Sequence, residues 1–140
     1  MNTPVKFEIA KLLKEKGFDE ECNSYYSQAL FEGTNPDWEG VFPKYSIFKR
    51  SDYHYNSKPN FNDLWVECSA PTIAEVVMWL YEKHGIWIIS SYELNIENHK
   101  KEWFWIAIKD GEEIAYQYRD FNLPTEAYEA AIEYTLENLI

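Results

Sequence analysis

The chain is poor in the residues that reactive and metal-binding sites need. Cys22 and Cys68 are its two cysteines, they are far apart, and its three histidines fall in no zinc-binding pattern. Its five glycines form no phosphate-binding loop, no nucleophile elbow and no dinucleotide fingerprint. The sequence therefore predicts no catalytic residue, no metal and no cofactor, and we expect a protein that is not an enzyme.

Long apolar runs and a secretory leader are also missing. This absence predicts a cytoplasmic protein without membrane association and with reduced thiols, although a Cys22–Cys68 disulfide remains an alternative. Basic residues are few as well: 13 lysines and arginines stand against 24 acidic residues, for a net charge of −11. That balance predicts repulsion from nucleic acid and from anionic membranes, and it suits a basic partner.

Aromatic residues are abundant, with 6 Trp, 11 Tyr and 8 Phe among 140 residues. This composition is far from that of disordered chains, and large rings supply core volume. A chain of this length buries roughly two-thirds of its unfolded surface. We therefore expect one domain, residues 1–140, with a substantial core.

The clearest element is a helix between residues 70 and 85. Thr72 and Glu75 have the spacing of a capping box, and Gly85 is a typical left-handed helix end. Apolar residues at helical spacing nearly surround the cylinder between them. The pattern predicts a helix that begins at Thr72 and is buried on more than one side.

Two further helices are expected at the ends of the chain. The first opens at Thr3 and Pro4 and stops at Gly17, and the last runs from residues 122–125 to the C-terminus. Between residues 25 and 31 a short helix is an even alternative to irregular structure.

The remaining segments favour strands. Residues 44–50 and 61–68 are predicted to pair as an antiparallel hairpin, and the run Ile86–Ile89 is typical of a strand covered on both faces, the middle of the sheet. Asp110-Gly111 predicts a tight turn between strands at 103–109 and 114–119. The expected fold is α+β in two layers, an antiparallel sheet with helices packed on it, in the order α-β-β-α-β-β-β-α.

Several segments resemble a family of small uncharacterised proteins from gut bacteria and their phages or mobile elements. These segments are the CSAPT lead at 68–72, the WLYEKHGI run at 79–86, the Trp-rich hairpin and the close TEAYEAAIEYTLENLI. The resemblance spans residues 5–140 and implies no activity. The order helix, three strands, helix from Thr72 onward is also similar to that of double-stranded RNA-binding domains. There, five basic residues face thirteen acidic ones, which opposes phosphate binding.

The polar residues mostly favour structural roles. His84 lies in the last turn of the predicted central helix, where an imidazolium suits the negative helix end. The paired glutamates Glu20-Glu21 and Glu112-Glu113 are interpreted as solvated surface. A nucleophile pair of Cys68 with a histidine has no supporting signature, and His54 and His99 have no acidic or thiol partner at metal-ligand spacing.

One stretch stands out as a candidate interaction surface. Between residues 41 and 61, aromatic residues are interleaved with four basic ones, a pattern that suits a protein-binding hot spot or base stacking. Core rings with snorkelling lysines are the equal alternative. The predicted contact residues are Tyr45, Phe48, Arg50, Tyr53 and Tyr55 here, with Trp87, Trp103 and Trp105 on the later strands.

Two hypotheses about function follow. The first is a non-enzymatic interaction module that binds another protein or itself, through the aromatic hairpin or an exposed sheet edge. The second is a phage or mobile-element regulator that acts near nucleic acid. It would act either as a binder through the 41–61 patch or as an acidic mimic of DNA.

Overall fold

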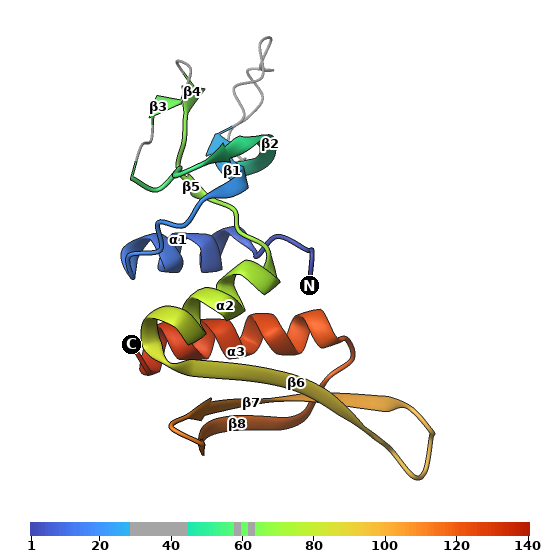
Figure 1. The fold of residues 1–140 in the computed structure, drawn as a ribbon. Coiled ribbons are helices and arrows are strands. Elements are labelled where there is room, and N and C mark those ends of the chain that lie inside the picture. The colour runs from blue at the N-terminus through green and yellow to red at the C-terminus, as the bar shows by residue number, and fades with distance from the viewer. Residues whose placement is uncertain (29–44, 58–59, 62–63) are drawn as a thin grey trace.

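The computed structural model describes residues 1–28, 45–57, 60–61 and 64–140. It confirms the α+β class: three helices lie between antiparallel sheets (Figure 1). The helices are α1 (Phe7–Glu15), α2 (Ile73–His84) and α3 (Pro124–Asn138). The strands are β1 (Cys22–Gln28), β2 (Tyr45–Tyr53), β3 (Asn60–Phe61), β4 (Leu64–Trp65), β5 (Cys68–Ser69), β6 (Ile86–Leu94), β7 (Lys101–Lys109) and β8 (Glu112–Phe121).

Helix α2 forms as its caps predict. The Glu75 backbone N–H donates to Thr72 Oγ1 at 3.2 Å, and the Thr72 N–H donates to Glu75 Oε2 at 2.8 Å, which completes the capping box. Gly85 ends the helix with φ of 68°. Its burial is less complete than expected, because Met78 and Tyr81 are 45% and 53% exposed. One stripe of α2 is therefore open to solvent.

The first helix begins later than the sequence predicts. Pro4 forms a β-bridge with Thr72, and the Ile73 N–H donates to the Thr3 carbonyl at 3.0 Å. This tertiary pairing holds the chain extended before the helix, so α1 starts at Phe7 instead of Pro4. The predicted stop is confirmed, since Gly17 has φ of 89°.

The upper sheet, β2-β1-β5, overturns two predictions. Residues 25–28 belong to strand β1 and not to a helix, and residues 29–31 lie outside the described part. The predicted hairpin of 44–50 with 61–68 is also wrong, because β2 and β5 each pair with β1. The stretch 61–68 contributes to three short strands, β3, β4 and β5. The CNSYYSQ sequence of β1 lacks clear alternation, so the sequence pattern does not predict this central strand.

The lower sheet has the order β6-β7-β8, with its tight turn as predicted: Asp110 and Gly111 have φ of 53° and 78°. Strand β6, expected in the middle, is an edge of this sheet among the described strands. Ile86 and Ile88 are buried under the helices, but Trp87 and Ile89 point to the opposite face and are 38% and 36% exposed. Only one face of this run is covered.

Helices α2 and α3 cover one face of the lower sheet, and α1 packs on α3 (Figure 1). The main core lies between these layers and includes Ile73, Leu80, Ile132 and Leu136. Within the described chain, a second and smaller cluster supports the upper sheet. The two clusters divide the molecule into a large lower body and a small upper layer.

Glu129 of α3 supplies a pH-dependent prediction. Its Oε2 is buried without a hydrogen-bond partner among the described residues, and burial raises the pKa of the carboxyl despite the nearby Lys6. A raised pKa favours the protonated form in the fold, so this contribution to stability is full below about pH 4 and is lost as pH rises through the folded pKa.

We therefore expect Glu129→Gln to raise the free energy of unfolding at pH 7 by about 0.5 kcal/mol, a value kept small because remaining solvent contact screens the charge. Denaturant titrations at neutral and acidic pH test this. The difference in free energy of unfolding between the variant and the wild type should vanish at about pH 4. A constant difference across that range would contradict it.

Candidate interaction surface

The aromatic segment 41–61 is only partly a surface. Residues 41–44 and the side chains of Tyr45 and Arg50 lie outside the described part. Phe48 is 36% exposed and stacks on Tyr25, and Tyr53 is half-buried. Tyr55, by contrast, is fully buried in the smaller cluster, so its selection as a contact residue is wrong. Its ring supplies core volume, which was the alternative interpretation.

The three tryptophans divide between the two faces of the lower sheet. Trp105 is 2% exposed, and its Nε1 donates to Gln117 Oε1 at 3.3 Å, so it is a core residue and not a contact residue. Trp103, two residues away on the same face, is half-buried and packs beside Tyr92. Trp87 alone of the three points to the uncovered face.

The uncovered side of the lower sheet, called here the outer face, carries an apolar surface that the strand register assembles. No helix lies below it in Figure 1. Strand pairing brings alternate residues of all three strands into adjacent rows, and the Phe104 and Tyr118 rings meet at 5.1 Å. The apolar residues of the outer face are Trp87, Ile89, Phe104, Ile106, Ile108, Tyr116 and Tyr118.

The charges on the outer face are all acidic among its described side chains. Glu93 and Glu102 are direct cross-strand partners, a like-charge pair that destabilises a sheet. Desolvation, together with the carboxylates of Glu113 and Glu93, raises the pKa of the Tyr118 hydroxyl. Lys101 and Lys109 pair with Leu94 and Ile86 and so belong to the helix side. The outer face therefore combines apolar area with negative potential.

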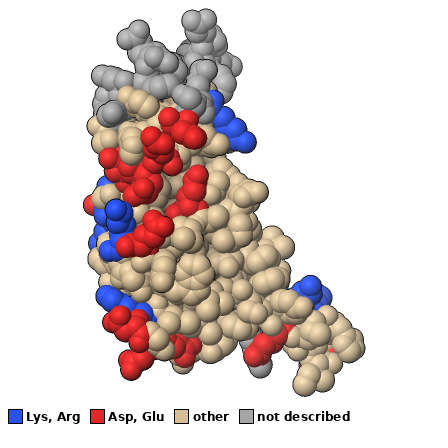
Figure 2. All heavy atoms as spheres, viewed as in Figure 1, with Lys and Arg blue, Asp and Glu red and all other residues tan. Residues whose placement is uncertain are grey.

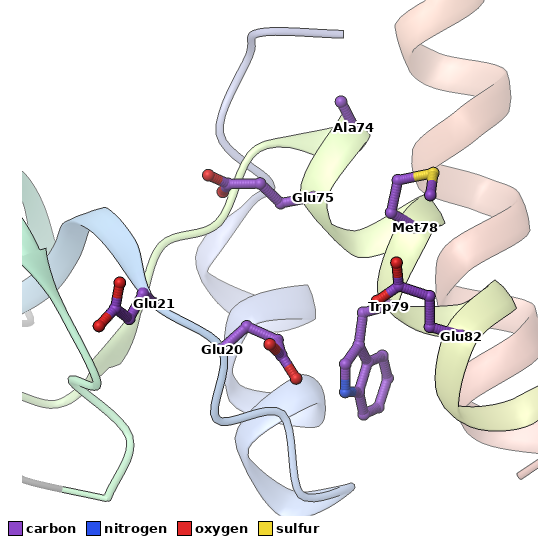
Figure 3. A pocket seen from close by; sticks show the side chains of 7 residues that line it. All are labelled: Glu20, Glu21, Ala74, Glu75, Met78, Trp79 and Glu82. Carbon is purple, nitrogen blue, oxygen red and sulfur yellow. The ribbon is translucent and has the colours of Figure 1, made fainter.

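An acidic groove lies between helix α2 and residues 20–21, which precede strand β1. Glu20 and Glu21 line one wall, and Glu75 and Glu82 of α2 line the other (Figure 3). Its volume is about 320 Å³, and its apolar lining is Ala74, Met78 and Trp79. Figure 2 shows acidic side chains gathered on this side of the molecule.

A second hollow, of about 420 Å³, adjoins this groove through the shared residue Met78. It is lined by Met78, Tyr81 and Trp87 and lies where α2 meets the start of β6. The Tyr81 and Trp87 rings contact edge to face at 5.3 Å. The apolar surface thus continues from α2 around the β6 edge.

The two cysteines are buried, and His54 contacts the segment before β1. Cys22 and Cys68 are free and buried, and burial raises the pKa of the Cys68 thiol to about 12. His54 Nδ1 donates to the Asp19 carbonyl oxygen at 2.6 Å, and its Nε2 lies 3.5 Å from Glu21. Across the described ranges, no three His, Cys, Asp or Glu residues are grouped as a metal site needs.

His84 is the last residue of α2, as predicted, but its expected positive charge is not supported. Desolvation and the neighbouring Lys109 lower the pKa of the ring, which packs edge to face against Trp79 at 4.9 Å. The lowered pKa favours the neutral ring, whose contact with Trp79 contributes packing.

Comparison with known proteins gives no relative to guide the interpretation. No family model, no curated protein and no solved structure matches the chain. The described helices include none with the length and apolar character needed to cross a bilayer.

Proposed function

We propose that this protein is a non-enzymatic, cytoplasmic interaction module that binds a basic amphipathic helix of a partner protein on the outer face. The observation that carries the proposal is one apolar sheet face whose described charges are all acidic. Contiguous exposed apolar area of this kind is typical of binding surfaces. Complementary charge at its margins selects the partner and its orientation.

A helix is the partner that suits this surface best. An open sheet face is most simply covered by a helix laid across it, as α2 and α3 cover the opposite face here. Lysines or arginines flanking the apolar stripe of that helix would lie near Glu113 and the Glu93–Glu102 pair. A cation placed between Glu93 and Glu102 would relieve their mutual repulsion.

The experiment uses a synthetic helical peptide with leucines on one face and lysines on the other, and a scrambled peptide of the same composition. We expect the full chain to bind the amphipathic peptide in calorimetry, more weakly as salt is added. Glu113→Lys should weaken binding about tenfold. Glu137→Lys is the control, because it makes the same change in net charge on α3, away from the outer face. It should weaken peptide binding less than Glu113→Lys does.

A matched pair tests the apolar contribution. Tyr116, 61% exposed on the outer face, is compared with Leu123, 54% exposed beyond it. Tyr116→Ala should reduce affinity, and Leu123→Ala should leave it unchanged. The proposal would be contradicted if the scrambled peptide bound as tightly as the amphipathic one. It would also be contradicted if the Glu113 and Glu137 variants lost the same affinity, because either result would indicate nonspecific charge attraction.

The acidic groove favours a second candidate function, that of a phage or mobile-element regulator acting as an acidic mimic of DNA. Its support is the convergence of four glutamates from two separate segments. A mimic of this kind displaces duplex DNA from a basic DNA-binding protein, and this competition should be lost on Glu82→Lys but kept on Glu113→Lys. Retention of the chain on DNA itself would instead favour the binder through residues 41–61.

A further inference from the structure

The edge of strand β6 is unusually well suited to pairing with another strand. All nine of its residues pair with β7 without a bulge, and within the described ranges no strand pairs on its other side. The sequence IWIISSYEL contains no proline, no lysine and one charge, so it lacks the usual devices that block edge pairing. Strand β8, the other edge, is interrupted by two register shifts.

The two ends of this edge are complementary to each other. The hollow of Met78, Tyr81 and Trp87 lies at the start of β6. At the other end, the β6–β7 hairpin projects past the helices and β8 (Figure 1) and carries two strongly exposed side chains, Leu94 at 60% and Ile96 at 92%. The turn also carries Glu97 and Lys100, so the apolar contribution of the projection comes from Leu94 and Ile96. These two side chains and the apolar hollow thus lie at opposite ends of strand β6.

From this geometry we propose that β6 pairs antiparallel with β6 of a second copy, about a two-fold axis near Ser90. Antiparallel pairing places the end of one strand beside the start of the other, so Leu94 of each copy lies opposite Ile86 of its partner. Both residues are on the helix side of the sheet, and Trp87, which lines the hollow, follows Ile86 directly in the chain. In a two-fold dimer the same contact occurs twice, so the hollow of each copy is next to the projecting hairpin of the other.

The residue at this axis permits close pairing. Ser90 would lie opposite Ser90 of the partner, and its Oγ is already buried within its own copy, so no bulky or charged side chain stands at the axis. Charge also permits the contact, because Glu93 of one copy would lie opposite Trp87 of the other and not opposite the second Glu93.

The interface is small, since one strand, one hollow and one hairpin tip contribute from each copy. Stable dimers bury about 800 Å² per partner with some 20–30 residues a side, and this contact uses fewer. We therefore expect a dimer that forms with rising protein concentration. Because each copy carries a net charge of −11, added salt should strengthen the dimer, whereas salt weakens binding of a basic helix.

The outer faces of the two copies would join into one six-stranded surface.

Sedimentation equilibrium of the full chain, from low micromolar to near-millimolar concentration and at two salt concentrations, tests the proposal. Leu94→Asp on the projection and Met78→Asp in the hollow should each weaken the dimer at least about tenfold. Leu123→Asp is the control, because Leu123 is similarly exposed but lies away from β6. Circular dichroism of each variant confirms that it is folded.

A wild-type chain that stays monomeric at the highest concentration and salt would overturn the proposal. An equal loss of dimer from Leu123→Asp would place the contact elsewhere and overturn it too. None of these variants changes the outer face itself. Peptide binding by a strictly monomeric chain would leave the proposed function standing, and a salt-strengthened dimer that ignores the peptide would leave only the dimer.

Discussion

Trp105→Ala is expected to lower the free energy of unfolding by about 3–5 kcal/mol, the range for removing a large ring from a core. Trp105 is 2% exposed on the central strand β7, its ring packs at 5.4 Å from that of Tyr134, and its indole N–H bonds Gln117. The substitution leaves a cavity beneath α3 and an unpaired amide oxygen. Chemical denaturation followed by circular dichroism measures the loss.

Trp87→Ala is the matched comparison, since Trp87 lies on the neighbouring strand but is 38% exposed. Its removal should cost about 1 kcal/mol, because much of the ring is already in water. If the two substitutions cost the same, the assignment of Trp105 to the core and Trp87 to the uncovered side would be wrong.

Tyr55→Ala is expected to cost about 3 kcal/mol and to loosen mainly the upper layer. Tyr55 is fully buried, with its ring 4.8 Å from Tyr25 and 5.4 Å from Tyr53. Its cluster is separate from the main core, so its loss should open β1 and β2 before the lower sheet. Hydrogen exchange should show faster exchange there and little change in β6–β8.

Phe48→Ala provides the comparison within the same layer. Phe48 stacks on Tyr25 at 5.6 Å but is 36% exposed, and its removal should cost about 1 kcal/mol. Uniform acceleration of exchange across both sheets on Tyr55→Ala would show that the two clusters unfold as one. Because Tyr55 is a core residue, weaker partner binding by this variant would report lost structure and not a lost contact.

Local signals predicted the elements that depend on local chemistry. The capping box at Thr72, the glycine stops at Gly17 and Gly85, and the Asp110-Gly111 turn are each satisfied by groups within a few residues of one another. Such features need no distant partner, so they can be recognised in the chain alone. The lower unit of α2, three strands and α3 follows from them.

The candidate site was harder to predict because exposure depends on distant parts of the chain. Alternation in Trp103–Lys109 separates two sets of side chains, but it does not say which set α3 covers. The outer face could have been recognised as the second apolar set on each strand. The acidic groove could not, since Glu20-Glu21 and Glu82 are brought together by the path between α1 and β1.

The sequence by itself determined the fold class, the caps and turns, the shortage of reactive groups and the strong negative charge. The tertiary structure decided that β6 is an edge, that β1 is the centre of the upper sheet, and that Tyr55 and Trp105 are core while Trp87 is not. The physical reason is that capping and turn bonds close within a few residues. Strand order and burial are set instead by contacts between segments far apart in the chain, which compete for the same apolar surface.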